Sequence, residues 1–191
     1  MRILMMALVA VASISPAMCV AQDETAVTRS TTAYVGSSLC TQPDQIVFSC
    51  PLLKSKKVVS VCASGKAAPH RFYYAFGKPH AIEMTYPSAS GNLSIGFERA
   101  RLFFAGATGG YAYSFINGSN YKYILYSISG TGFDVAGVLV KRLENLRALS
   151  DSRCEPGKLE VTNNVELQNE LGDWAHDADL EAHGLPHVPR D

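Results

Sequence analysis

The stretch that decides the fold is "FSCPLLKSKKVVSVCASG", residues 48–65, in which Cys50 and Cys62 bracket a short basic segment. Three lysines lie in that segment: Lys54, Lys56 and Lys57. Apolar runs on both sides of a polar, proline-containing segment are typical of two antiparallel strands joined by a turn. A metal knuckle or a redox pair would need closely spaced cysteines such as C-x-x-C, and no such spacing occurs. We therefore interpret the stretch as a hairpin whose cysteines form structural disulfides.

The chain begins with the features of a secretory signal peptide. Arg2 is followed by an apolar run from Ile3 to Ile14, and then by Pro16 and small residues. We expect a signal peptide over residues 1–21, with cleavage after Ala17 as the alternative. The apolar run is too short for a membrane anchor, and no later segment supplies the ~20 apolar residues of a transmembrane helix. The mature protein is therefore expected in the periplasm or outside the cell, without a membrane span.

Cysteine usage agrees with that compartment. Four of the five cysteines remain in the expected mature chain: Cys40, Cys50, Cys62 and Cys154. An even number of cysteines in an oxidising compartment predicts two disulfides. The sequence leaves all three possible pairings of these four cysteines open. Cys50 and Cys62 need not bond each other, because direct cross-strand partners would have to lie opposite in register.

Charge divides the chain at Pro156-Gly157. The region from Gln22 to Arg153 contains fourteen basic residues (Lys and Arg) and eight acidic residues (Asp and Glu). The region from Glu155 to Asp191 contains two basic and nine acidic residues. We therefore expect, after the signal peptide, three regions: an N-terminal extension over 22–39, a disulfide-tied β-domain over 40–154 and an acidic tail over 155–191.

Between Cys40 and Cys154 the apolar residues recur with period two, which is typical of short antiparallel strands. The predicted strands are residues 46–48, 58–61, 71–76, 81–86, 93–97, 101–104, 112–116, 121–128 and 135–140. Asn117-Gly118 predicts a hairpin. Residues 141–153 fit a short helix, or a strand and a turn at Glu144-Asn145 before a last strand, and we favour the strands. The sequence predicts an all-β fold, a small antiparallel barrel or sandwich of about eight to ten strands.

The acidic tail is expected to be partly disordered, with a short helix between Val165 and Trp174. It holds no cysteine and few large apolar residues, so we expect it to add little to the core. A chain that stops after Gly157 should then keep nearly unchanged thermal stability. Three histidines lie among its carboxylates: His176, His183 and His187. They could bind a metal weakly, but a solubilising extension is the preferred interpretation, and we predict neither a metal site nor a cofactor.

No pattern in the sequence indicates catalysis. The nucleophile-elbow, zinc-protease, P-loop and dinucleotide-binding motifs do not occur. His70 and His80 lie beside prolines at predicted strand ends, and the carboxylates of the β-domain are too scattered to suggest an acid–base pair. We therefore predict that the protein is not an enzyme.

Three features could form a binding surface. The first is a group of lysines: Lys54, Lys56 and Lys57, with Lys66 and Lys78. The second is an aromatic band, more typical of cross-strand core packing: Tyr111, Tyr113, Phe115, Tyr121 and Tyr123. The third is the glycine-rich loop "GATGGY", residues 106–111, which could be a mobile binding loop or an ordinary turn. The candidate binding residues are Lys54, Lys56, Lys57, Lys78, Gly109 and Tyr111.

The segment from Cys40 to Cys154 contains "IVFSC", "VVSVCAS", "FGK", "EMTYP", a glycine-tyrosine strand and a closing cysteine. It resembles small secreted β-proteins of Gram-negative bacteria, mostly of unassigned function. Its general form, a signal peptide and a disulfide-tied β-domain without a catalytic motif, is similar to that of periplasmic lysozyme inhibitors and immunity proteins.

This resemblance implies a non-catalytic binding protein, an inhibitor or immunity protein for a cell-wall-degrading enzyme or effector. Its partner would be a protein and not a nucleic acid, and a disulfide-rigidified loop would fill the partner's cleft. The alternative is a cell-envelope module that binds an acidic polymer or small ligand through its lysine-rich face. Steep salt sensitivity would distinguish that lysine-driven contact from a cleft-filling one.

Overall fold

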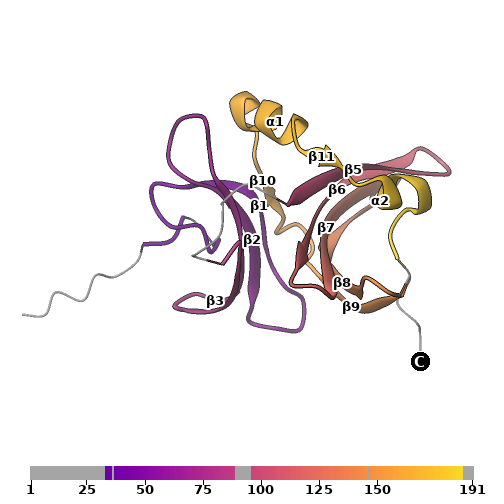
Figure 1. Cartoon of the computed structure of the whole chain (residues 1–191), viewed down its shortest axis with the longest axis horizontal. Coiled ribbons are helices and arrows are strands. Elements are labelled where there is room, and N and C mark those ends of the chain that lie inside the picture. Colours follow the sequence, from indigo (N-terminus) through magenta and orange to yellow (C-terminus); the bar gives the residue numbers. More distant parts are fainter. Residues whose placement is uncertain (1–32, 36, 89–95, 146, 187–191) are drawn as a thin grey trace, which may run out of the picture. The chain divides into compact units, whose positions relative to one another are not determined.

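The computed structural model describes residues 33–35, 37–88, 96–145 and 147–186. The expected signal peptide and most of the expected N-terminal extension lie outside these residues. Within them the fold is all-β, with eleven strands in two sheets and two short helices near the C-terminus (Figure 1). The sheets do not close on each other, so the fold is a sandwich and not a barrel.

The first sheet has the strand order β10-β1-β2-β3-β4, and all its neighbours are antiparallel. Its strands are β1 (Gln45–Pro51), β2 (Val58–Ala63), β3 (Phe72–Lys78), β4 (Ala81–Tyr86) and β10 (Glu160–Val161). The hairpin predicted from residues 48–65 is confirmed, because β1 pairs with β2 and the lysines occupy the turn between them.

The second sheet has the order β11-β5-β6-β7-β8-β9, in which only β11 runs parallel to its neighbour. Its strands are β5 (Phe97–Phe104), β6 (Thr108–Asn117), β7 (Tyr121–Gly130), β8 (Phe133–Arg142), β9 (Ala148–Arg153) and β11 (Ala175–His176). The Asn117-Gly118 hairpin is confirmed, with Gly118 at φ 66°. Residues 141–153 form strand, turn and strand, as favoured. The predicted strand 101–104 lies within β5. Of the predicted strand 93–97 only Phe97 belongs to β5, because Gly96 lies in a turn and residues 93–95 lie outside the described residues.

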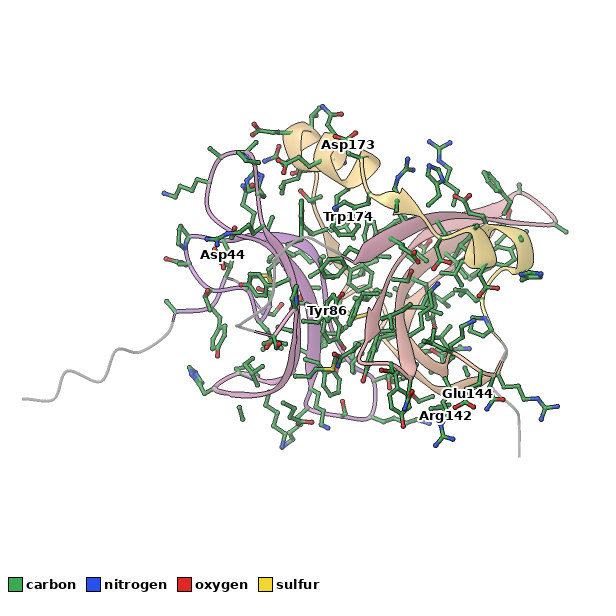
Figure 2. The ribbon with its side chains drawn as sticks, viewed as in Figure 1. Asp44, Tyr86, Arg142, Glu144, Asp173 and Trp174 are labelled. Carbon is green, nitrogen blue, oxygen red and sulfur yellow. A yellow bond between two sulfur atoms is a disulfide. The ribbon has the colours of Figure 1, made fainter. Side chains whose placement is uncertain are left out.

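The main core lies between the two sheets. Its largest fully buried side chains include Phe48 and Tyr74 of the first sheet and Phe115 and Leu125 of the second. The rings of Tyr74 and Phe115 are 5.0 Å apart, and Tyr86 stacks on Phe115 at 4.2 Å. Figure 2 shows Tyr86 in the interior between the sheets. Each such side chain contributes roughly 1.5–3 kcal/mol by leaving water.

Two disulfides tie the sandwich, which confirms the prediction for the four cysteines. Cys50 bonds Cys154, which follows β9, over a sequence separation of 104 residues. Cys40 bonds Cys62 and fastens the segment before β1 to the face of β2 that points away from the main core. Cys50 and Cys62 cannot bond each other, because Cys50 lies opposite Val59 and not opposite Cys62.

The C-terminal segment is part of the sandwich, so the expectation that it adds little to the core is wrong. Strand β10 extends the first sheet and β11 extends the second. Helix α1 (Val165–Gly172) buries Leu167 and Leu171 in the main core. Helix α2 (Ala178–His183) buries Leu180 against the outer face of the second sheet. The short helix expected in this region is present, but it packs instead of extending into solvent. None of the described helices is long and apolar enough to cross a membrane.

Candidate binding surface

The predicted lysines gather at one end of the first sheet. Lys54, Lys56 and Lys57 lie in the β1–β2 turn, and Lys78 ends β3 at the same end, because Val58 pairs with Gly77. Lys66 lies at the other end, after β2. The Nζ of Lys57 is 2.8 Å from Glu83 Oε2 and 5.0 Å from the ring centroid of Phe76. Lys57 is therefore engaged with its own sheet. A binding role for these lysines stays a prediction.

Gly109 and Tyr111 lie within β6, so the glycine-rich segment is mostly strand and not a mobile loop. The turn between β5 and β6 covers only residues 105–107. Gly109 pairs with Ser129 and Tyr111 with Ser127 on β7. Between them, Gly110 is required because a Cβ at this position would overlap the carbonyl oxygen of Ser127. The glycines thus allow close strand contact.

The aromatic band is largely core, which was the preferred interpretation. Phe115 is buried, and its ring stacks on Tyr123 with centroids 5.1 Å apart. Tyr111 and Tyr113 are partly buried against the main core, whereas Tyr121 is exposed. Burial raises the pKa of Tyr111 to about 12, although a hydrogen bond with Ser127 opposes part of that rise. Tyr111 is therefore neutral at physiological pH.

A cavity of ≈390 Å³, which we call the hairpin cavity, lies where the β1–β2 turn meets the ends of β7 and β8. It is lined by Leu53, Ser127, Ser129, residues 134–136, residues 153–157 and Leu159. Backbone hydrogen bonds fix its walls: Leu53 N donates to Arg153 O (2.7 Å), and Cys154 N donates to Ala136 O (2.9 Å). The Cys50–Cys154 disulfide crosses the same place. The walls are therefore held in place by the fold.

The hairpin cavity brings together regions that are far apart in the sequence. Leu53 precedes Lys54 of the lysine turn, and Ser127 and Ser129 lie opposite Tyr111 and Gly109. None of the six candidate binding residues lines this cavity itself. Three of them, Lys54, Lys56 and Lys57, lie in the same turn as the lining residue Leu53. Gly109 and Tyr111 pair with the lining residues Ser129 and Ser127. Lys78 is farther away, on β3. The sequence thus located the neighbourhood but not the lining residues.

Phe103 is the most exposed of the large hydrophobic residues that the structure describes, and it is not among the candidate binding residues predicted from the sequence. Its side chain belongs to β5, lies opposite Gly109, and is 81% exposed. The register continues from Gly109 to Ser129 and from Ser129 to Asp134. Because Gly109 has no side chain, no side chain of β6 separates Phe103 from Ser129, which lines the hairpin cavity. The consecutive Phe103 and Phe104 were the available signal, since neighbouring residues of a strand point to opposite faces.

A second cavity, of ≈230 Å³, lies between α1 and strands β5 and β6, and we call it the α1 cavity. It is lined by Arg99, Ala100, Arg101, Tyr111, Ala112, Tyr113, Gln168, Leu171 and Gly172. Tyr111 thus lines the α1 cavity while it lies beside Ser127 of the hairpin cavity. The two cavities therefore adjoin on the same face of the second sheet.

One polar network resembles catalytic chemistry, but the imidazole at its centre is buried. His70 Nδ1 lies 2.6 Å from Glu170 Oε1, and its Nε2 is 3.0 Å from the amide nitrogen of Gln45. The His70 side chain is fully buried. Gln45 also accepts a hydrogen bond from Asn164, the N-cap of α1. The network therefore fastens both ends of α1 to the first sheet, and no substrate can reach the imidazole.

A second network explains the charge division of the sequence. Lys122 Nζ is 2.6 Å from Asp177 Oδ2, and both side chains are almost fully buried, at 7% and 2% exposed. Ser114 donates to the same carboxylate, and Asp177 Oδ1 accepts from Leu180 N and so caps α2. Lys141 Nζ is 2.7 Å from Asp179 Oδ2. Helix α2 and its N-cap are therefore docked on lysines of the outer face of the second sheet, and not on the lysine turn.

The tail histidines make pairwise contacts. His176 Nδ1 is 2.9 Å from Glu181 Oε1, and His183 Nδ1 is 3.2 Å from Asp179 Oδ1. Over the described ranges, no group of three or more His, Cys, Asp or Glu side chains is arranged to hold a metal ion. His187 lies outside those ranges.

Comparison with known proteins finds no match for this chain among family models, curated proteins or solved structures. The function must therefore be inferred from the geometry of the chain itself.

Proposed function

We propose that the protein is a non-catalytic secreted or periplasmic binding protein whose partner is another protein, and that it acts as an inhibitor or immunity protein against a cell-wall-degrading enzyme or effector. The observation that carries the proposal is the Phe103 ring, which is 81% exposed at the end of the second sheet. A large aromatic side chain in water adds nothing to the core of its own fold. At protein interfaces, by contrast, aromatic anchors supply much of the binding energy.

The surroundings of Phe103 support a protein contact. Leu53, in the β1–β2 turn, is a second exposed apolar side chain at this end of the sandwich, whereas Phe104 and Phe133 are exposed on the opposite face of the second sheet. The charged Arg101 lies two residues from Phe103 on the same face of β5, and Asp134 lines the hairpin cavity. An apolar centre with a charged rim is the usual composition of an interface.

The mode of action would be occlusion. The β5–β6 hairpin would enter the partner's cleft with Phe103 at its centre, and the fixed walls of the hairpin cavity would receive a projection of the partner. Because backbone hydrogen bonds and the Cys50–Cys154 disulfide already hold these elements, little conformational entropy is lost on binding. No covalent chemistry is required of this chain.

The test is inhibition of peptidoglycan cleavage. The mature protein is added to a muramidase, an amidase and an endopeptidase acting on purified cell wall, and loss of turbidity is followed. We expect inhibition of one class, and Phe103→Ser should weaken it by at least about tenfold. Ile116→Ser is the matched control, because Ile116 is a 41% exposed apolar residue at the other end of β6. The proposal is wrong if no class is inhibited, or if the two variants weaken inhibition equally.

A second candidate function, binding of an acidic polymer, is favoured by the lysine end of the first sheet. Lys54, Lys56 and Lys78 are exposed and make no ion pair with any residue in the described part of the chain. Their attraction for a polyanion would fall steeply with salt. Binding of polyglutamate that disappears at high salt, and in a variant with these three lysines changed to Gln, would favour this function over the first.

A further inference from the structure

We propose that the α1 cavity is a binding site for an oxyanion group, a carboxylate or a phosphate, and that the guanidinium groups of Arg99 and Arg101 are its principal donors. This inference does not rest on the protein-binding function, which depends on Phe103.

The strand geometry brings the donors together. Arg99 and Arg101 are two residues apart on β5, so their side chains leave the same face of the sheet. In register they lie opposite Tyr113 and Tyr111 of β6. All four residues line the α1 cavity, and α1 adds the amide of Gln168. Each guanidinium carries five N–H donors in a planar fork that matches the two oxygens of a carboxylate or phosphate.

The positive charge at the cavity is only partly balanced. Neither guanidinium is within ion-pair distance of a carboxylate in the described residues, although eight other ion pairs are formed there. Arg99 is oriented by the C-terminal segment, since its Nε donates to Trp174 O (3.3 Å) and its Nη2 is 2.9 Å from His176 Nε2. The Arg101 guanidinium has no hydrogen-bond partner among the residues that the structure describes.

The carboxylate that faces this region is Glu181 of α2. Its pKa is lowered chiefly by the hydrogen bond with His176, and also by a bond from the backbone of Arg101 and by the charge of Arg99. Glu181 Oε1 accepts from Arg101 N at 3.4 Å. One carboxylate against two guanidinium groups leaves a local excess of positive charge for a ligand to balance.

The two tyrosines of the lining are uncharged. Burial raises the pKa of Tyr111 to about 12 and raises that of Tyr113 as well, so both phenols keep their protons at neutral pH. They therefore add no negative charge to the lining. The charged side chains that line the cavity are those of Arg99 and Arg101, and this positive lining suits an oxyanion.

The size of the cavity limits the ligand. A volume of ≈230 Å³ is below the roughly 300–1,000 Å³ of pockets that enclose a drug-sized molecule. The site therefore suits inorganic phosphate, or the acidic end of a small organic acid. Its wall is preorganised, because α1 is fastened through Glu170 and Asn164 to the first sheet.

Trp174 provides a direct readout. It is the single tryptophan of the sequence, and its ring meets that of Tyr113 edge-on, with centroids 5.4 Å apart. Figure 2 shows Trp174 just below α1. A ligand that contacts Tyr113 or Arg99 should change its emission.

The experiment titrates the mature protein with inorganic phosphate in one arm and citrate in the other, at constant ionic strength set with chloride, and follows Trp174 fluorescence with calorimetry as a second measurement. We expect a saturable response in at least one arm, and the arms distinguish a phosphate site from a carboxylate site. Arg101→Gln should weaken binding at least about tenfold, whereas Arg101→Lys should have a smaller effect, because lysine keeps the charge but not the fork.

Arg142→Gln is the matched control. Arg142 is also an exposed β-strand arginine, but it lies opposite Tyr121, ~20 Å along β7 from Ser127, the partner of Tyr111. Figure 2 shows it on the side of the molecule away from Trp174. This variant should bind as the unchanged protein does. Non-saturable responses in both arms, or equal loss in Arg101→Gln and Arg142→Gln, would overturn the proposal. Inhibition through Phe103 would be unaffected by either outcome.

Discussion

Both faces of the second sheet carry basic residues, but these residues differ in burial and in ion pairing. On the outer face, Lys122 and Lys141 are buried and paired with carboxylates of the C-terminal segment. On the inner face, beyond the cover of the first sheet, Arg101 is exposed and has no carboxylate partner among the described residues, and Phe103 projects two residues further along β5.

The difference separates residues that stabilise the fold from residues that are free to bind. A buried lysine without a partner is strongly destabilising, so Asp177 and Asp179 are needed where they lie. An exposed arginine beside an exposed phenylalanine makes no comparable contribution to the core. The first group should therefore respond to mutation with a loss of stability, and the second with a loss of binding.

The largest expected effect comes from removing the C-terminal segment. A chain that stops after Gly157 loses Leu167, Leu171 and Leu180, each fully or almost fully buried. Truncation of one such leucine to alanine costs about 2–5 kcal/mol, and the whole free energy of unfolding of a domain is about 5–15 kcal/mol. We expect the shortened chain to be unfolded by circular dichroism, with both disulfides oxidised.

A milder variant keeps this test informative if the shortened chain cannot be purified. Leu167→Ala should lower the free energy of urea unfolding by about 2–5 kcal/mol. Val165→Ala, at a position 67% exposed in the same helix, should change it by no more than about 0.5 kcal/mol. Equal effects of the two substitutions, or an unchanged midpoint for the shortened chain, would mean that α1 does not pack in solution.

The next effect compares a buried ion pair with an exposed one. Lys122→Met leaves the carboxylate of Asp177 buried without its cation and should cost about 3–5 kcal/mol in urea unfolding. Lys57→Met breaks the exposed contact with Glu83 and should cost about 0–1 kcal/mol. The double variant Lys122→Met/Asp177→Leu should recover much of the loss, less about 1 kcal/mol for the missing cap of α2. If Lys122→Met were as mild as Lys57→Met, the outer-face pair would not be buried.

The features of the fold that depend on residues close together in the sequence were predicted correctly. Short apolar segments such as residues 58–61 predicted strands, Asn117-Gly118 predicted a hairpin, and the four cysteines of the expected mature chain predicted two disulfides. The packing of the C-terminal segment was missed because Leu167, Leu171 and Leu180 stand singly among charged residues, and each helix is too short to show a sustained period. The lysines that pair with this segment lie far away in the sequence, on β7 and β8.

For the candidate site, the sequence predicted segments that lie near the hairpin cavity but not the residues that line it. The sequence identified the lysine turn and the Gly109–Tyr111 stretch, but which residues line a cavity depends on how far the first sheet extends over the second. In β5 both Phe103 and Phe104 are apolar, so alternation alone cannot say which of them is uncovered. Arg101 was missed because an exposed arginine on a strand is ordinary until its neighbours in space are known.

The smallest expected effect is the acid sensitivity of the outer face. The pKa of Asp179 is lowered from its usual 3.8, chiefly by the hydrogen bond from Lys141 and in smaller part by His183 and Lys122. A carboxylate with a lowered pKa stabilises the folded protein above its unfolded-state pKa, and this contribution is lost as the pH falls through the folded-state value. Asp179 is 40% exposed, so solvent screening limits the contribution to less than about 1 kcal/mol.

Carboxyl NMR titration should therefore show Asp179 with a pKa below 3.8, and stability should decline slightly as the pH is lowered below about 4. Lys141→Gln should return the Asp179 pKa towards its usual value, short of it because His183 and Lys122 remain. Lys57→Gln should leave it unchanged, since Lys57 contacts the first sheet. If Lys141→Gln did not move the pKa, the Lys141–Asp179 pair would not form in solution, and α2 would be held on the outer face by its other contacts, chiefly Leu180 and the Lys122–Asp177 pair.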